Sequence, residues 1–369
     1  MSDWKSLLKA DPTDWLIEKD NASVRYFALT DILDIPTDSP RAIGAKREIM
    51  ETGVVPKILA KQEDGGYWGK PEDFYIRSKY KGTVWQLIIL AELGADGWDE
   101  RIRKACEFIL ENSQDRSSGG FSIRGTPENG GNHSTVIPCL TGNMVRSLIR
   151  FGYLEDSRLQ RGINWITTYQ RFDDRVDKPP AGWPYDSAYG CWGKHICSMG
   201  AVKALKALSE IPEETRSPEV KETIVKGVEY FLQHHVHKRS HAPDKVCKPG
   251  WLKFGFPLMY QTDALEILGV LTKLGYHDKR MQEAIDLLIS KQDDMGRWTM
   301  ENTFNGRFQV NIESRDRPSK WVTLNALRVL KACGLSEIRS QDQGLQLTKR
   351  RIVQLWINSG SGVHDSRGY

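Results

Sequence analysis

Two pairs of cysteine and histidine residues could bind zinc or transfer protons. Cys139 lies six residues after His133, and Cys191 lies four residues before His195, which is one turn of a helix. A helix that begins near Pro138 would favour the thiolate of Cys139 and lower its pKa. Thiolate and imidazole groups suit a zinc site formed by these four side chains. The same side chains suit metal-free acid–base catalysis, and the cysteines could also be core residues.

Two aspartates and a tyrosine are further candidates for proton transfer. Asp186 and Tyr189 lie in an aromatic segment shortly before Cys191, and Asp186 is the preferred general acid. Asp263 begins the sequence Asp263-Ala-Leu-Glu266, which is typical of a helix N-cap with a capping box. Because burial raises the pKa of a carboxyl group, Asp263 could also serve as a general acid if it were shielded from water.

Half of the eight histidines lie in one short basic segment, at positions 234, 235, 237 and 241. Lys238 and Arg239 lie between them. We interpret this segment as a solvent-exposed loop. A lid over the site and a metal site are the alternatives.

Large aromatic residues gather near the same candidate groups. They are Tyr80, Trp85, Trp192, Trp251, Phe254, Phe256, Tyr260 and Trp321. Aromatic faces attract a positive charge by cation–π interaction. We expect these side chains to bind the substrate.

A repeat explains why such distant residues should meet. The segment Gln62-Glu-Asp-Gly-Gly-Tyr-Trp68 returns in related form at 114–121, with looser copies at 170–184 and 292–298 and a degenerate copy at 233–251. The glutamines that begin these copies are 52 to 63 residues apart. A regular period of this kind is typical of repeat architectures.

Two kinds of helix are predicted between the repeat loops. Apolar helices that end near glycine are predicted at 83–94, 140–152, 197–208, 262–275 and 321–334, and amphipathic helices around 102–110, 220–231 and 281–288. An N-terminal hairpin (1–54), the repeats (55–335) and a closing helix (336–357) then complete six hairpins. We predict an all-α fold, an α6/α6 barrel over residues 1–357, with an open solenoid as the alternative. Residues 358–369 are predicted to be a disordered tail.

The loops Gln62–Trp68 and Gln114–Phe121 resemble the QW-type repeats of the terpenoid cyclase and protein prenyltransferase superfamily, over about residues 55–335. The resemblance implies an α/α toroid whose lumen holds an isoprenoid or another apolar small molecule. The sequence contains no Asp-x-Asp-Asp, no Asp-x-Cys and no adjacent Cys-His, which are the active-site motifs of three groups of such barrels.

We therefore expect an enzyme that performs cyclisation, isomerisation, hydration or dehydration by acid–base chemistry without a cofactor. A zinc-dependent cysteine–histidine enzyme of the prenyltransferase or thiol-activating type is one alternative. A non-catalytic barrel that binds a ligand is the other.

The composition limits the remaining function classes. The 369 residues include 52 Lys and Arg against 48 Asp and Glu, a net charge of +4, which argues against a nucleic-acid binder. Charged residues interrupt the N-terminus, and the six cysteines are too few for a disulfide scaffold, so we expect a cytoplasmic protein. No transmembrane segment is predicted, whereas peripheral membrane contact and the oligomeric state are left open.

Overall fold

The computed structural model describes residues 4–334, except for 76–78, 175, 188 and 189. The predicted closing helix, the predicted tail and Tyr189 lie outside the described residues. No helix in the described part of the chain is both long enough and apolar enough to cross a lipid bilayer.

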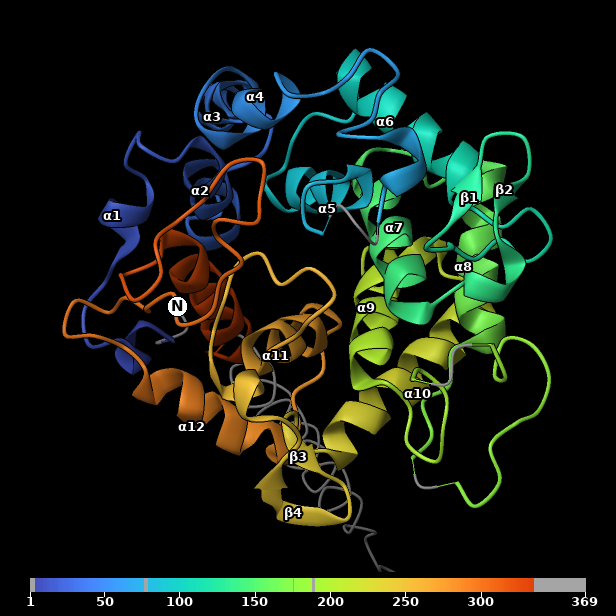
Figure 1. The fold of residues 1–369 in the computed structure, drawn as a ribbon. Helices are drawn as coiled ribbons and strands as arrows, with labels where there is room; N and C mark the ends of the chain where they lie inside the picture. Colours follow the sequence, from blue (N-terminus) through green and yellow to red (C-terminus); the bar gives the residue numbers. More distant parts are fainter. Residues whose placement is uncertain (1–3, 76–78, 175, 188–189, 335–369) are drawn as a thin grey trace, which may run out of the picture.

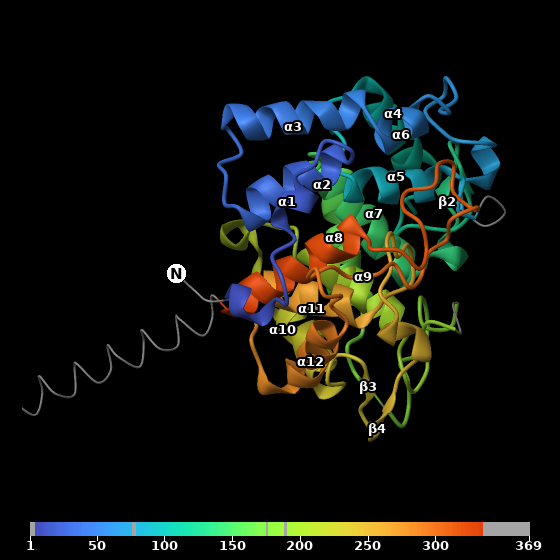
Figure 2. The same ribbon diagram turned by 90° about the vertical axis from the view of Figure 1, so that its left-hand side faces the viewer.

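Helices are arranged in two layers around a common centre (Figures 1 and 2). The inner layer consists of α2 (Ala22–Phe27), α5 (Thr83–Glu92), α7 (Pro138–Arg150), α9 (Ser198–Leu208), α11 (Ala264–Lys273) and a helix over residues 320–334. The outer layer consists of α3 (Pro40–Glu51), α4 (Val54–Leu59), α6 (Glu100–Asn112), α8 (Ser157–Tyr169), α10 (Pro218–Gln233) and α12 (Gln282–Ser290). A short helix α1 (Thr13–Leu16) precedes them, and a π-helical turn (Ala28–Ile32) continues α2.

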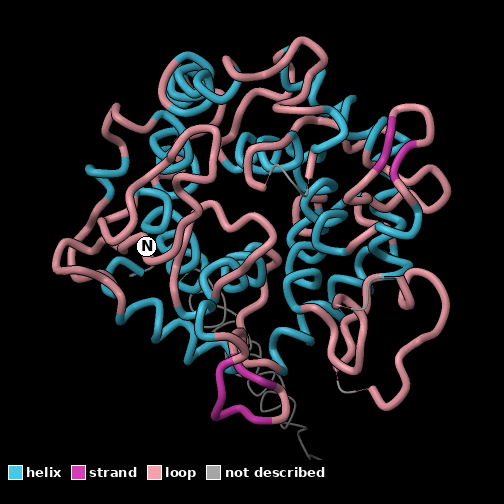
Figure 3. The backbone as a smooth tube through the Cα atoms, viewed as in Figure 1, coloured by secondary structure: helices cyan, strands magenta, loops and turns pink. Residues whose placement is uncertain are grey.

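The prediction of an all-α chain is confirmed, because the named strands of the described residues form only two small hairpins. These are β1 (Gly125–Thr126) with β2 (Gly130–Gly131), and β3 (Lys238–Arg239) with β4 (Ala242–Val246). Both hairpins lie at the periphery of the molecule (Figure 3).

Contacts between inner helices run around a closed ring. α5 packs against α7, α7 against α9, and α9 against α11. Gly269 of α11 faces the Val329 side chain of the last helix. Arg328 of that helix forms an ion pair of 2.6 Å with Asp31, which lies in the π-helical turn that continues α2. Phe27 of α2 in turn lies against Gly94 at the end of α5. Hairpins at the two ends of the described chain therefore meet.

The two predicted kinds of helix take the expected layers. Every residue from Thr83 to Ala91 of α5 is buried, as a helix with apolar residues on all faces requires. α6 buries Ile102, Ala105 and Ile109 while its charged face points outward. Gly94 follows α5 with φ of +73°, the left-handed conformation expected of a glycine that ends a helix.

The repeat loops connect one hairpin to the next through their glutamines. Each side-chain amide donates a hydrogen bond to a backbone carbonyl of a following or closing segment: Gln62 to Arg101 (2.9 Å), Gln114 to Arg158 (2.7 Å) and Gln292 to Leu7 (2.9 Å). The aromatic residues of the same loops, Trp68, Phe121 and Trp298, are fully buried. The looser copy differs, since Gln170 bonds to the neighbouring Arg171 carbonyl and Trp183 is only half-buried.

The closest approach of α7 and α9 depends on Gly142. A Cβ atom at this position would lie 2.5 Å from the Lys203 carbonyl carbon and 2.6 Å from the Ala204 nitrogen. We expect Gly142→Ala to lower the free energy of unfolding by about 1–3 kcal/mol. The added methyl group would clash with backbone atoms of α9, which cannot move aside as a flexible side chain can. Gly269→Ala is the control, since its Cβ would meet nothing nearer than 4.0 Å. Urea unfolding measures both, and equal effects would contradict this account of the packing.

Candidate functional site

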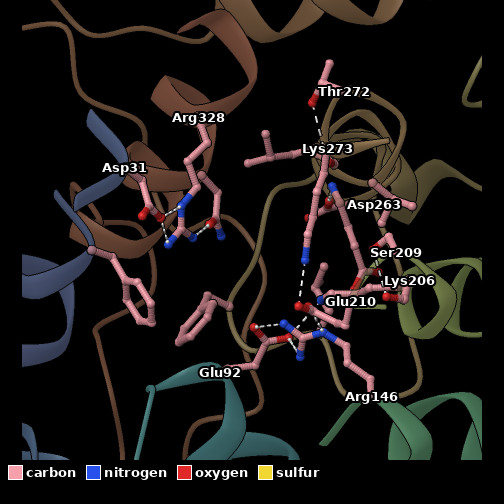
Figure 4. A pocket seen from close by; sticks show the side chains of 18 of the residues that line it. Asp31, Glu92, Arg146, Lys206, Ser209, Glu210, Asp263, Thr272, Lys273 and Arg328 are labelled. Carbon is pink, nitrogen blue, oxygen red and sulfur yellow. Dashed lines mark hydrogen bonds and ion pairs between the residues drawn. The ribbon is translucent and has the colours of Figure 1, made fainter. Parts of the chain in front are cut away.

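A cavity of about 490 Å³ lies inside the ring of inner helices (Figure 4). All six inner segments contribute to its lining, mainly with the second halves of their helices. Five acidic residues line it: Asp31, Glu92, Glu210, Asp263 and Glu266. Five basic residues face them: Arg146, Arg150, Lys206, Lys273 and Arg328. The lumen is therefore strongly charged at this end, in contrast to the apolar lumen implied by the resemblance.

Ion pairs connect these charges from helix to helix. Arg146 of α7 pairs with Glu92 of α5 at 2.9 Å and with Glu210 after α9 at 3.1 Å. Lys206 of α9 pairs with Glu92 at 2.8 Å, and Lys273 of α11 pairs with Glu210 at 2.6 Å. Burial by itself would raise the pKa of Glu92, but Arg146 and Lys206 hold it well below its usual value. Each buried charge thus has an opposite charge within contact distance, as burial requires.

The sequence prediction missed this network, although a signal was present. Charged residues are almost never fully buried unless they are paired. Glu92 interrupts an apolar helix, and Arg146 and Lys203 lie among apolar residues of α7 and α9, so these charges needed partners inside the ring. The partners could not be identified, because they lie on other helices.

Asp263 and Glu266 both line this cavity, and their pKa values are shifted in opposite directions. Asp263 is 1% exposed, and burial raises its pKa to about 7, an effect that the nearby Glu266 carboxylate reinforces. Burial opposes ionisation of Glu266 too, but Lys203 and Lys206 outweigh it and lower its pKa to about 2. The Lys203 ammonium lies 2.7 Å from both Glu266 oxygens. One carboxyl group therefore exchanges its proton near neutral pH while its neighbour stays ionised.

The predicted N-cap at Asp263 is also present. Its Oδ1 accepts a hydrogen bond from the Glu266 N–H at 2.8 Å, and Oδ2 accepts one from the Gly255 N–H at 3.0 Å. The reciprocal half of the capping box is absent, because the Glu266 side chain binds the two lysines instead. Capping and a raised pKa therefore coexist in one residue.

Two of the predicted substrate-binding residues, Phe256 and Trp321, lie beside this cavity. Their rings stack at 4.2 Å with an interplanar angle of 5°. Trp321 also contacts Phe27, with ring centroids 6.1 Å apart. Phe256 and Phe27 are part of the cavity lining, whereas Trp321 packs behind them. Aromatic faces thus share the cavity with Asp263.

A second aromatic cluster forms where the inner helices begin. Trp85 stacks on Tyr75 at 4.8 Å and meets Tyr80 edge-on at 5.0 Å. Tyr80 hydrogen-bonds to Tyr260, and the Lys79 ammonium lies 4.6 Å above the Tyr260 ring. Burial opposes ionisation of Tyr260, but hydrogen bonds from Tyr80, Gln261 and Lys79 lower its pKa. Trp85, Tyr80 and Tyr260 come together as expected, but they do not line the charged cavity.

The remaining predicted aromatic residues pack in the core away from the cavity. Trp192 is buried against Trp165 of α8, with centroids 6.5 Å apart. Trp251 and Phe254 are buried, and the Lys291 ammonium lies 5.2 Å above the Phe254 ring. None of these three lines the cavity, so its lining does not support a substrate-binding role for them.

The predicted activation of Cys139 is wrong. Its thiol is buried in the first turn of α7, and burial raises its pKa to about 12. Burial raises the pKa of Cys191 as well. The two thiols interact with each other and with Cys197, and Tyr75 hydrogen-bonds to Cys139. Loss of hydration outweighs the helix N-terminus, so these cysteines are protonated.

The predicted acid Asp186 lies at the surface. It is exposed in a turn, where a carboxylate oxygen accepts a hydrogen bond from the Gly182 N–H at 2.6 Å. It is therefore not in a buried environment shielded from water. Asp263, expected to serve first as a cap, has that environment.

The four predicted zinc ligands do not form a site. His133 Nδ1 lies 2.7 Å from Oδ2 of Asp115, and its ring stacks on Trp183 at 4.0 Å. His195 pairs with Asp174 instead, at 2.6 Å. Among the described residues, the only group of three or more potential ligands within reach of one another contains neither Cys139 nor Cys191.

Comparison with known proteins gives a distant likeness to solved structures. No protein-family model matches the chain, and no curated protein matches it. Among solved structures, the chain is similar to the type II terpene cyclase MstE from Scytonema, with a TM-score of 0.38 at 13% identity over 86% of this chain and 88% of that chain. A variant of that protein in complex with geranylgeranyl dihydroxybenzoate gives a TM-score of 0.38 at 13% identity, over 85% and 87% of the two chains. At this identity the likeness concerns the fold alone.

Proposed function

We propose that the six hairpins form an α6/α6 toroid, a terpenoid cyclase-like enzyme whose lumen is the reaction chamber. Its substrate is an isoprenoid or a similar apolar molecule that also carries an anionic group. The reaction is acid-initiated, and Asp263 supplies the proton.

The opposite pKa shifts of Asp263 and Glu266 carry this proposal. Two neighbouring carboxyl groups with pKa values pushed apart are typical of acid–base sites, in which one is the acid and the other a fixed charge. Glu266 is held by two lysines, so its charge persists and disfavours ionisation of Asp263. A general acid works best when its pKa lies near the operating pH, which a value of about 7 satisfies.

The proton balance needs no cofactor. Transfer of the Asp263 proton to a double bond forms a C–H bond and leaves a carbocation and the Asp263 carboxylate. Phe27 and Phe256 line the same cavity and can stabilise that positive charge. Loss of a proton from a neighbouring carbon to the carboxylate then restores the acid, so the net reaction is an isomerisation or a cyclisation.

Arg150 favours a substrate with an anionic group. Its guanidinium lines the cavity, yet its ion pair with Glu210 is 3.6 Å long, and it lies 5.7 Å from the centre of the Phe27 ring. Burial and repulsion by Arg146 lower its pKa. A carboxylate or phosphate group beside it would relieve both effects.

Replacement of this arginine should weaken binding of acidic ligands only. We expect Arg150→Met to raise the Kd for a prenyl carboxylic acid by about tenfold, because a charge-assisted hydrogen bond contributes about 1.5–3 kcal/mol. The methyl ester of the same acid is the control ligand, and its Kd should stay within about twofold. Titration calorimetry measures both, and an equal loss for acid and ester would contradict the anion site.

The direct test of the function is product analysis by mass spectrometry. Purified protein is incubated with prenyl acids, prenyl diphosphates and neutral polyprenes, in parallel with its Asp263→Asn variant. The expected result is a rearranged product from at least one substrate with the unsubstituted protein and none with the variant. Tight binding of a ligand with no turnover by either protein would favour a ligand-binding barrel instead.

A further inference from the structure

Three segments of chain meet at Asp174, on the side of the ring where α9 begins. Asp174 follows α8, His195 precedes α9, and both lie side by side as an isolated antiparallel bridge. His241 lies in the turn between β3 and β4. A carboxylate oxygen and one nitrogen from each of these histidines all lie within 4.8 Å of one another. We propose that Asp174, His195 and His241 bind a divalent transition metal, with zinc as the best match.

The carboxylate at the centre of this group is nearly inaccessible to water. Its side chain is 9% exposed, while the His195 side chain is 54% exposed. Ser240 donates a hydrogen bond to Oδ2 of Asp174, and Nδ1 of His195 lies 2.6 Å from Oδ1. A carboxylate with imidazoles beside it is a donor set that zinc accepts in proteins.

A third histidine also lies beside the Asp174 carboxylate. His234 is buried, and its Nδ1 donates a hydrogen bond to the Tyr230 carbonyl at 2.7 Å. In a neutral imidazole the other nitrogen, Nε2, then carries a lone pair. That nitrogen lies 3.5 Å from Oδ2 of Asp174. His234 therefore places a further nitrogen atom beside the Asp174 carboxylate.

The positions of the donors allow a metal to bind with small movements. Zinc–nitrogen bonds of about 2.0–2.1 Å in a tetrahedral site place ligand atoms about 3.3 Å apart. The present separations, up to 4.8 Å, are larger. His195 and His241 are exposed and lie in loops, so their rings can turn toward Asp174 without disturbing a helix. The metal would tie the segment before α9 to the β3–β4 hairpin.

The chain offers a matched control for this site. His133 and Asp115 form the same Nδ1-to-carboxylate contact, at 2.7 Å against 2.6 Å for His195 and Asp174. The exposure of the two histidine side chains is similar, 50% and 54%, and both carboxylates are buried. The His133 pair lacks a second histidine within reach among the described residues. If an Asp–His pair alone were sufficient to bind zinc, zinc would therefore bind both at His195 with Asp174 and at His133 with Asp115.

The test uses the untagged full-length protein, freed of metal by a chelator and then dialysed against zinc. We expect about one equivalent of bound zinc and a rise in Tm with zinc but not with magnesium, which prefers oxygen ligands. His241→Ala and His195→Ala should weaken zinc binding by at least about a hundredfold, because each removes a direct ligand. His133→Ala should bind zinc as the unsubstituted protein does.

The same measurements can overturn the proposal. An unsubstituted chain that retains no zinc and shows no shift in Tm would mean that these side chains do not bind the metal. Equal zinc binding by His241→Ala, His195→Ala and His133→Ala would place the metal elsewhere. Because His241 is exposed in a turn, its replacement leaves the core intact and keeps the comparison valid.

Discussion

Replacing Asp263 with asparagine is expected to lower kcat by about 10²–10⁴-fold, the usual contribution of a positioned general acid. Asparagine has nearly the same shape and keeps the acceptor that caps α11 through the Glu266 N–H. It cannot donate a proton in the way a carboxylic acid does. The KM should change much less than kcat, because the side chain acts in the transition state.

The pH dependence should follow the ionisation of the same group. The reaction needs protonated Asp263, so kcat should fall as pH rises through about 7.

The free energy of unfolding should also fall as pH rises. In the unfolded chain the Asp263 carboxyl group loses its proton near its ordinary pKa of 3.8, whereas in the folded chain it keeps the proton up to a pH of about 7. Between these values the unfolded state binds fewer protons, so the free energy of unfolding decreases as pH rises, and the Asp263→Asn variant should lack this slope.

Asp186→Asn is the control for this prediction. It makes the same chemical change at an exposed turn outside the cavity, so kcat should stay within about twofold, as surface substitutions remote from a site usually do. The amide nitrogen introduced by Asp263→Asn cannot accept the Gly255 hydrogen bond, at a cost of about 1–3 kcal/mol, so activity is measured well below the Tm of the variant. If Asp186→Asn lost activity and Asp263→Asn retained it, the assignment of the acid would be wrong.

The largest expected effect on stability comes from Lys203. Its side chain is 2% exposed, and its ammonium lies 2.7 Å from both oxygens of Glu266. Lys203→Met should lower the free energy of unfolding by about 3–5 kcal/mol, because the Glu266 carboxylate stays buried with only Lys206 beside it. Urea unfolding at neutral pH measures the change.

Two further variants separate the buried charge from simple loss of a side chain. Lys226→Met removes an exposed pair with Glu222, with side-chain exposures of 61% and 67%, and should cost no more than about 0.5 kcal/mol. In the double variant Lys203→Met with Glu266→Met no uncompensated charge remains, so most of the stability should return. Lys206 keeps its second partner Glu92 there. A double variant as unstable as the single one would contradict this explanation.

Much of the fold could be predicted from the sequence because it depends on short-range patterns. The apolar run 83–94 predicted the helix observed as α5, and Gly94 ends it with a positive φ. The capping pattern at Asp263 predicted the start of α11. The repeat glutamines Gln62, Gln114 and Gln292 predicted the loops that connect hairpins. Periodicity, caps and turn residues act within a few positions of the chain, so they can be read directly.

Only the tertiary structure determined which polar side chains contact one another. His133 and His195 each contact an aspartate, Asp115 and Asp174, and not the expected cysteines. Cys139 is buried where a thiolate was expected, and Asp186 is exposed where burial was required. The pKa of a side chain depends on the water it loses and on charges that other helices bring within a few ångströms. Those neighbours are distant in the sequence, so the chemistry of Asp263 could only be recognised once Glu266, Lys203 and the closed ring around them were in place.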